Sequence, residues 1–335
     1  MGLPRSKYVQ EGKVGVYNCT TRCVRRAFLA GFDCHTGRDF SHRKQWIEDR
    51  LQFLASIFSV EVATFSVMSN HYHVTVRTRP DIVENWSERE VASRWLTLCP
   101  NRYKSKKKAK DPVEEQIRNL ADCTERIAEF RKRLGSLSWF MRFLNEFIAR
   151  AANKEDGVKG RFWESRFKCQ VLLDYAAIAG GMVYIDLNPI RAGLAKTPED
   201  SDFTGIQQRI RIWKQKASSP DRESPSSSWL CPISSEGNKL RILPMSEEEY
   251  FTLVDKSGRL LHPDKRGVMD ADLAPILERI GAKPEAWLET ISCFEDKFRL
   301  AAGLVDNLRK FADQLGKRWF TGMSASRSVF EPSKS

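Results

Sequence analysis

The stretch VATFSVMSNHYHVTVR occupies residues 62–77. Two runs in which apolar and polar residues alternate flank a polar Ser-Asn pair, and this pattern predicts two β-strands joined as a hairpin. His71 and His73 stand two positions apart in the second run. On a strand, both imidazoles then project from one face while the apolar residues pack behind them. This predicts half of a metal site, although a His-x-His pair on its own fits two structural imidazoles equally well.

Further strands and helices are predicted on both sides of this hairpin. A strand over residues 14–24 precedes a helix that Ser41 can cap, and a strand over residues 160–173 precedes a helix that Asp174 can cap. The intervening residues, from about 85 to 152, have mostly helical periodicity. The order β-α-β-β-helices-β-α predicts an α+β fold, namely a ferredoxin-like (RRM-like) antiparallel sheet with a helical insertion.

Two regions of different composition follow one another along the chain. Residues 217–238 are rich in Ser and Pro, which is typical of a linker, and we place a domain boundary there. Residues 1–216 would form a catalytic-sized domain. Residues 239–335 would form a mostly helical C-terminal extension in which no chemical motif is recognised, so the role of the extension stays open.

Positive charge is concentrated ahead of that boundary. Residues 1–216 contain 38 Lys and Arg against 25 Asp and Glu, a net charge of +13, whereas residues 217–335 contain 17 against 18. A basic module of this size favours a polyanionic partner, usually nucleic acid. A soluble protein that is merely basic is the alternative.

Length and composition exclude several classes of protein. A chain of 335 residues with 41% apolar residues can bury a sizeable core, which argues against general disorder. No apolar run reaches the roughly 18 residues of a membrane span, and residues 1–10 lack the apolar core of a signal peptide. The eight cysteines are scattered without zinc-ligand spacing. We therefore expect a soluble, cytoplasmic protein with reduced thiols and no membrane partner.

A second motif, MVYIDLNPIRAGL, lies at residues 182–194. Tyr184 and Asn188 are four apart, so they share one face near the end of the predicted helix, which Pro189 and Gly193 terminate. A phenol hydroxyl and an amide oxygen are thereby presented together. A core tyrosine followed by an ordinary helix-end asparagine is the alternative.

Three motifs in a fixed order carry a resemblance to a known family. They are MSNHYH at residues 68–73, GRFWESRFK at residues 160–168 and YIDLNPIRAGL at residues 184–194. The combination resembles the REP-associated tyrosine transposases, which belong to the wider HUH single-tyrosine transposase group. The resemblance covers about residues 14–205, and the combination is far more specific than any one motif.

The resemblance implies an enzyme that cleaves and rejoins single-stranded DNA near hairpins through a 5′-phosphotyrosine. By motif, His71 and His73 would bind a divalent cation, Mg²⁺ or Mn²⁺, Tyr184 would attack, and Asn188 would complete the coordination. Imidazole, amide oxygen, phosphate and water suit such a cation better than thiolates do. A tyrosine of ordinary pKa, about 10, is a poor nucleophile at neutral pH, so the reaction needs positive charge nearby.

The implied partner is single-stranded or hairpin DNA, and the implied location is the cytoplasm, in association with the nucleoid. Monomer and homodimer both stay open. The sequence departs from the family at one position, since relatives often carry His two residues after the tyrosine, where this chain has Asp186. A carboxylate there either joins the metal shell or faces solvent, and we expect it to face solvent.

Candidate DNA contacts combine cations with an aromatic side chain, because phosphates attract Arg and Lys and unstacked bases lie on indole or guanidinium planes. Strand periodicity places Arg161 and Trp163 on one face and Arg166 and Lys168 on the other. A lysine-rich run at residues 104–110 is either a solvated loop or a phosphate contact. The candidate DNA-binding residues are Arg22, Arg25, Arg26, Arg161, Trp163, Arg166, Lys168 and Arg191.

Two other classes of function stay open. A domesticated DNA-binding protein of the same fold that no longer cleaves would keep the basic surface, although the intact set of His71, His73, Tyr184 and Asn188 argues against it. A metal-dependent hydrolase of small molecules would explain the two histidines but not the uneven charge.

Overall fold

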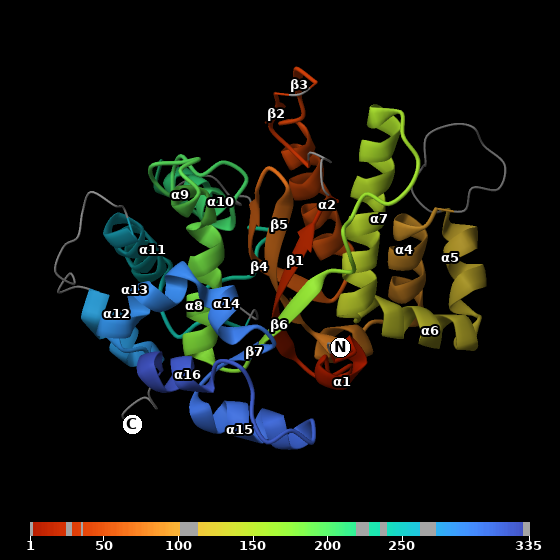
Figure 1. Ribbon diagram of the computed structural model, residues 1–335. Coiled ribbons are helices and arrows are strands. Elements are labelled where there is room, and N and C mark those ends of the chain that lie inside the picture. The colour runs from red at the N-terminus through yellow and green to blue at the C-terminus, as the bar shows by residue number, and fades with distance from the viewer. Residues whose placement is uncertain are drawn as a thin grey trace.

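A five-stranded mixed sheet lies at the centre of the computed structural model, with helices on both faces (Figure 1). The structure describes residues 3–24, 29–34, 36–100, 113–218, 228–234, 240–261 and 273–330. The strand order is β4-β5-β1-β6-β7, in which β4, β5, β1 and β6 pair antiparallel and β7 pairs parallel with β6. The strands are β1 Gly15–Arg22, β4 Val60–Val67, β5 His71–Thr78, β6 Lys168–Leu172 and β7 Ala301–Ala302. The predicted α+β class is confirmed.

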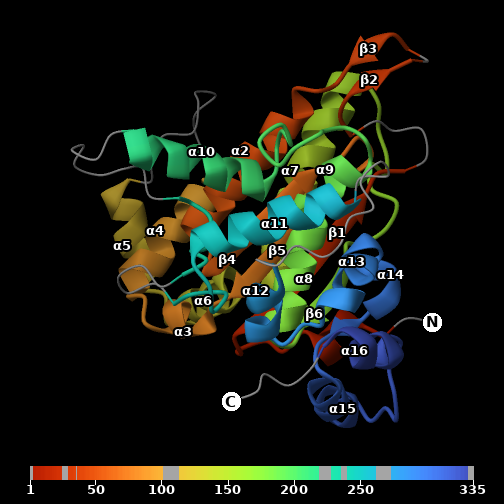
Figure 2. The ribbon, with the colours of Figure 1, turned by 90° about the vertical axis from the view of Figure 1, so that its left-hand side faces the viewer.

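Helices α2 (Arg43–Ile57) and α7 (Leu137–Asp156) cover one face of the sheet, and α8 (Tyr175–Asp186) covers the other (Figure 1). Helices of the C-terminal region pack outside α8, as the view turned by 90° also shows (Figure 2). A small hairpin of β2 (Phe32–Asp33) and β3 (Arg38–Asp39) projects beyond the sheet.

Among the described helices, none has the length and apolar character that crossing a membrane requires. The remaining helices are α1 Arg5–Tyr8, α3 Pro80–Glu84, α4 Glu88–Leu98, α5 Glu114–Ala121, α6 Thr124–Leu134, α9 Asn188–Arg191, α10 Gly205–Ser218, α11 Glu247–Leu261, α12 Leu273–Ile280, α13 Pro284–Ser292, α14 Phe294–Phe298, α15 Val305–Gln314 and α16 Met323–Val329.

The apolar face of the sheet follows from alternation along the strands. The hairpin predicted around the two histidines is present as β4 and β5. Tyr72, Val74 and Val76 on β5 are fully buried and share one core cluster with Tyr17 and Cys19 of β1 and with residues of α2 and α7. This face is the larger hydrophobic core of the molecule, and it anchors the strands that carry the site.

The opposite face of the same strands is polar although it is buried. Asn18, Thr75 and Gln170 occupy neighbouring positions on β1, β5 and β6. The Thr75 hydroxyl donates to Asn18 Oδ1 at 2.7 Å, and Asn18 Nδ2 donates to Gln170 Oε1 at 3.4 Å. Gly181 lets α8 lie directly on this row, because a Cβ there would stand 2.6 Å from Asn18 Nδ2. Buried polar groups are costly unless they are paired, so this face is a candidate for function rather than for packing alone.

Of the two predicted helix caps, Asp174 is present and Ser41 is not. Asp174 accepts a hydrogen bond of 3.1 Å from the backbone N–H three residues on, at the start of α8, and Ser87 does the same at the start of α4. Ser41 does not cap α2, because its hydroxyl donates to Asp39 Oδ1 instead. The predicted strand over residues 160–173 is shorter than expected, since only β6 pairs as a strand within it.

The C-terminal region packs directly on the predicted core. Strand β7 extends the sheet beyond β6, and helices α13 and α14 contact α8. The backbone N–H of Cys231 donates to the carbonyl of Val62 on β4 at 2.7 Å, and the neighbouring Leu230 is buried. Both residues belong to the predicted linker at 217–238, of which only 228–234 and the end of α10 are described. The division into two domains stays a prediction.

Candidate functional site

Two histidines meet at one end of β5. The ring centroids of His71 and His73 are 4.8 Å apart, so the two imidazoles lie together as the alternation predicts. The register of the sheet places Thr20 opposite His73 and Arg22 opposite His71 on β1, and Lys168 opposite Thr20 on β6. Side chains directly opposite each other in a ladder point to the same face. The sheet therefore gathers a hydroxyl and two exposed cations around the imidazoles.

The ring of His73 is almost completely buried and is held at one nitrogen. Its Nδ1 lies 2.9 Å from Glu295 Oε1 and 3.0 Å from Thr20 Oγ1. Thr20 donates its hydroxyl hydrogen to the same Glu295 oxygen at 2.6 Å, so the hydrogen between Nδ1 and these oxygens must come from Nδ1. The other nitrogen, Nε2, is buried and has no hydrogen-bond partner in the described part of the chain. A neutral His73 therefore carries its proton on Nδ1 and keeps the lone pair on Nε2.

Glu295 acts as a carboxylate in this contact. Burial opposes its charge, but the hydrogen bond from His73, the attraction to His73 and His71 in their protonated forms and the hydrogen bond from Thr20 outweigh burial and lower the pKa of Glu295 to about 2. A carboxylate only accepts hydrogen bonds, which agrees with a proton on His73 Nδ1.

His71 is held in a similar way. Its Nδ1 lies 2.6 Å from Asn70 Oδ1. Burial, together with the nearby His73 and Arg22, lowers the pKa of His71 to about 3, so its imidazole is neutral at neutral pH. With Nδ1 donating to Asn70, the lone pair again lies on Nε2. Neutral imidazole with the other nitrogen bonded to an oxygen is the form in which histidine binds metal ions.

The phenol of Tyr184 stands beside the two histidines. Its ring is 5.9 Å from that of His73 at an interplanar angle of 88°, and the residue is only 9% exposed. The guanidinium carbon of Arg191, from α9, lies 4.4 Å from the centre of the Tyr184 ring. Burial and then Glu295 raise the pKa of Tyr184, while Arg191 lowers it. Arg191 is thus a positive charge next to the phenol, a role that was not predicted from the sequence.

Asn188 lies one helical turn beyond Tyr184, at the start of α9. It is buried, and its Nδ2 has no hydrogen-bond partner among the described residues. The described interactions include no contact between its amide and either imidazole. Helix α8 ends at Asp186, so Asn188 and Pro189 belong to the next helix and not to the end of the helix that carries Tyr184. The role of Asn188 as a metal ligand stays a prediction.

Asp186 does not face solvent, and that expectation is wrong. Its side chain is fully buried and accepts hydrogen bonds from the hydroxyl of Thr64, from the N–H of Ile206 at 3.1 Å and from the hydroxyl of Tyr250 at 2.5 Å. Two positions along a helix turn a side chain by about 200°, so Asp186 points away from the Tyr184 side. Burial raises the pKa of Asp186 to about 6 despite these bonds. Asp186 therefore ties α8 to β4, α10 and α11.

The predicted DNA contacts fall into two groups. The exposed cations are Arg22, Arg161, Arg166, Lys168 and Arg191. Trp163, in contrast, is half-buried, because its Nε1 donates to the carbonyl of Asn145 at 2.9 Å and its ring packs edge-on against Tyr72 at 5.8 Å. The indole of Trp163 therefore packs against the apolar face of β5 and is not exposed for stacking with a nucleic-acid base. Arg25, Arg26 and the lysine-rich run at 104–110 lie outside the described residues.

Strand periodicity does not apply between Gly160 and Phe167. Within this segment, the described pairing is one isolated bridge between Trp163 and Cys23, made by two hydrogen bonds of 2.9 Å, from the N–H of Glu164 to the carbonyl of Arg22 and from the N–H of Val24 to the carbonyl of Phe162. The predicted assignment of these residues to two faces of a strand is therefore wrong. The segment runs irregularly along the end of β1 and becomes a strand only at β6.

The described side chains of the site do not form a complete set of metal ligands. The described residues contain no group of three or more His, Cys, Asp or Glu side chains that could hold a metal ion by themselves. They offer two imidazoles that each keep a lone pair on Nε2, one of them buried and without a partner in this part of the chain, and a buried amide at the start of the next helix. Mg²⁺ and related cations usually keep water and phosphate oxygens among their ligands. The residues therefore fit a cation shared with a phosphate substrate, and they do not resemble a structural zinc site.

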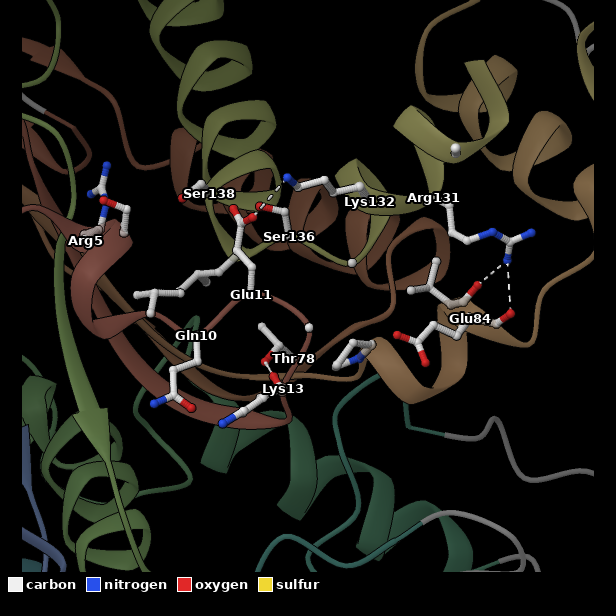
Figure 3. A pocket seen from close by; sticks show the side chains of 18 residues that line it. Arg5, Gln10, Glu11, Lys13, Thr78, Glu84, Arg131, Lys132, Ser136 and Ser138 are labelled. Carbon is white, nitrogen blue, oxygen red and sulfur yellow. Dashed lines mark hydrogen bonds and ion pairs between the residues drawn. The ribbon is translucent and has the colours of Figure 1, made fainter. Parts of the chain in front are cut away.

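A cavity of about 560 Å³ lies at the other end of β5, between α1, α3, α6 and the start of α7 (Figure 3). Thr78, the last residue of β5, lines it, and the length of that strand separates it from the two histidines by roughly 20 Å. Lys132 at its edge pairs with Glu11 at 3.5 Å, and Arg131 donates to backbone carbonyls at the end of α3. The cavity is therefore not part of the histidine site.

No protein-family model matches the chain, and no curated protein matches it either. Among solved structures, the chain is similar to a REP-associated tyrosine transposase bound to a REP hairpin. The two share 12% sequence identity at a TM-score of 0.32, and the match covers 72% of this chain and 99% of the other. A likeness of this degree does not establish a function, which rests on the residues of the site.

Proposed function

We propose that this chain is a metal-dependent DNA strand-transferase of the HUH single-tyrosine type, a transposase that cleaves and rejoins single-stranded DNA near hairpins. The observation that carries the proposal is the position of the Tyr184 phenol against His73, whose buried Nε2 has no hydrogen-bond partner in the described chain. A nucleophile and a cation ligand are thereby adjacent although they come from different elements. The exposed Arg22 and Lys168 next to them favour a phosphate backbone as the substrate.

In the proposed reaction, the Tyr184 oxygen attacks a backbone phosphate. The bond from phosphorus to the 3′-oxygen breaks, so that the tyrosine becomes joined to the 5′-phosphate and a 3′-hydroxyl is released. The phenol proton passes to solvent, the released 3′-oxygen takes a proton from solvent, and Arg191 stabilises the negative charge on the phenol oxygen. Because the phosphotyrosine conserves the energy of the cut bond, a 3′-hydroxyl can reverse the step and join strands without ATP.

His71, His73 and, by the family resemblance, Asn188 would hold the cation, Mg²⁺ or Mn²⁺. When bound, the cation polarises the scissile phosphate and offsets its charge. The chain prepares both rings for this role, since an oxygen engages Nδ1 of each and leaves the lone pair on Nε2.

The core would be ferredoxin-like (RRM-like), with single-stranded or hairpin DNA as its partner near the nucleoid. The segments β1-α2-β4-β5-α7-β6 follow the order of a βαββαβ unit, and β1 lies between β5 and β6 in the sheet. This arrangement leaves the α8 face of β1 and β5 for the site.

A non-cleaving DNA-binding protein of the same fold is the second candidate. The observation in its favour is that burial and Glu295 raise the pKa of Tyr184, which disfavours the phenolate. For cleavage, Arg191 and the cation have to offset that effect.

Labelled single-stranded hairpin oligonucleotides, incubated with Mg²⁺, Mn²⁺ or EDTA, test the proposal. We expect a protein–DNA adduct that is stable in SDS, requires the cation and disappears in Tyr184→Phe, while hairpin binding persists. Tyr175→Phe is the matched control, because Tyr175 is an exposed tyrosine at the start of the same helix. Hairpin binding without any adduct in the wild type would support the second candidate, and an adduct in Tyr184→Phe would exclude Tyr184 as the nucleophile.

A further inference from the structure

We propose that Glu295, from helix α14 of the C-terminal region, is a positioning residue that fixes the imidazole of His73 with its proton on Nδ1 and its Nε2 lone pair available to the cation. The inference rests on the proposed function. It assigns a role to a part of the chain that lies outside the three motifs, and it makes the C-terminal region a component of the site.

The geometry places the proton of this contact on His73 Nδ1. Glu295 Oε1 receives the Thr20 hydroxyl at 2.6 Å and lies 2.9 Å from His73 Nδ1. Thr20 has one hydroxyl hydrogen, which it donates to Glu295, and the carboxylate has none to give, so His73 Nδ1 is the donor. A histidine whose second nitrogen is bonded to a carboxylate is oriented for metal binding, and such partners commonly change metal affinity by about 10- to 100-fold.

Packing on both sides holds Glu295 in place. Phe294 and Phe298 flank it on α14, are both fully buried, and their rings lie 4.9 Å apart. Phe294 packs on α8 at Gly180, where a Cβ would stand 2.9 Å from its ring. Shortly after α14 the chain enters the sheet as β7, beside β6. The carboxylate of Glu295 therefore lies on α14, which packs against α8 and is followed by strand β7 of the sheet.

A purely structural ion pair is the alternative, and the tautomer of His73 distinguishes the two. The full-length protein, labelled with ¹⁵N-histidine and free of metal, is measured by long-range ¹H–¹⁵N NMR, with His73→Gln used to assign the His73 signals. We expect the Nδ1–H tautomer in the wild type. Glu295→Ala should move His73 towards the Nε2–H tautomer, and Glu295→Gln should keep Nδ1–H, because an amide oxygen still accepts.

Mn²⁺ titration of the same variants gives a second measurement. The Kd for Mn²⁺ should rise by roughly tenfold or more in Glu295→Ala and by less in Glu295→Gln. Asp296→Ala is the matched control, since it removes an exposed carboxylate from the next position of the same helix and should change neither quantity. If Glu295→Ala does not fold, Thr20→Val replaces it, because the loss of the hydroxyl also loosens the carboxylate and should shift the same tautomer.

An unchanged tautomer together with an Mn²⁺ Kd within twofold of wild type, in a folded Glu295→Ala or Thr20→Val protein, would overturn the positioning role. The proposed function and the positioning role are contradicted by different results. If the protein forms no DNA adduct but Glu295→Ala shifts the tautomer, strand transfer is contradicted and the positioning role of Glu295 is supported. If the adduct forms but the tautomer does not shift, strand transfer is supported and the positioning role is contradicted.

Discussion

Arg191 lies over the ring of Tyr184, with 4.4 Å between the guanidinium carbon and the ring centre. The two residues come from consecutive helices, α8 and α9, and Leu187 is the residue between those helices. A guanidinium in this position favours negative charge on the phenol oxygen, which burial and Glu295 disfavour. The pair therefore combines a desolvated nucleophile with the charge needed to activate it.

Substitution of Arg191 by Ala should slow cleavage. Loss of one preformed donor or charge beside a reacting oxygen commonly costs about 100-fold in rate, and we expect that order of effect on single-turnover formation of the DNA adduct. Arg191→Lys should recover part of the rate, because it keeps the charge but not the planar group. Arg309→Ala, which removes an exposed arginine on α15 that is not among the predicted DNA contacts, is the control. Equal cleavage rates in Arg191→Ala and the wild type would show that Arg191 contributes nothing to activation.

The hairpin of β4 and β5 and the shared face of the two imidazoles could be predicted because both depend on alternation within a few residues. The spacing of Tyr184 and Asn188 is equally local. Glu295 is 222 positions from His73, and its surroundings have the pattern of an ordinary short amphipathic helix. Its arrival at the site depends on the packing of α14 against α8 and on the pairing of β7, neither of which is encoded locally.

A usable signal for the polar face was nevertheless present in β1. Asn18, Thr20 and Arg22 alternate with the buried Tyr17 and Cys19 in that strand. Three polar residues on one face of a central strand indicate that this face meets something other than a hydrophobic core. Thr20 could have been found in this way, whereas its partner from the C-terminal region could not.

Asp186 should be important for stability rather than for catalysis. Asp186→Ala would leave three buried donors without their acceptor, those of Thr64, Ile206 and Tyr250. Each buried group left unpaired costs about 1–3 kcal/mol, so we expect a loss of roughly 3 kcal/mol or more in the free energy of unfolding, measured with urea. Asp306→Ala removes an exposed carboxylate on α15 and should change stability by less than about 0.5 kcal/mol. A loss below about 1 kcal/mol for Asp186→Ala would contradict the structural role.

The exposed cations beside the histidines should increase the affinity for DNA without changing the preference for particular DNA sequences. Lys168→Ala and Arg22→Ala should each weaken binding to hairpin oligonucleotides of any sequence, because both side chains lie at the ends of strands that flank the site. Each lost phosphate contact should reduce the slope of log K against log salt by about 0.7 on single-stranded DNA. Fluorescence anisotropy over a series of salt concentrations measures both quantities. Lys310→Ala, an exposed lysine on α15, is the control, and an unchanged slope in both site variants would place the DNA elsewhere.

Gly180 should determine how closely α14 approaches the nucleophile's helix. A Cβ at Gly180 would stand 2.9 Å from the buried ring of Phe294, so Gly180→Ala must displace that ring and with it the neighbouring Glu295. Overpacking of this kind typically costs about 1–3 kcal/mol, partly offset by roughly 1 kcal/mol from the better helix propensity of alanine. We therefore expect a modest loss of stability together with weaker Mn²⁺ binding.

A double-mutant cycle with Phe294→Leu tests that coupling. The smaller side chain makes room for the added methyl group, so the double variant should be more stable than the sum of the two single effects predicts, by at least about 0.5 kcal/mol. The Kd for Mn²⁺ should follow the same pattern, because the restored fit returns Glu295 towards His73. Strictly additive effects on both stability and metal affinity would mean that the contact between α8 and α14 does not control the position of the carboxylate.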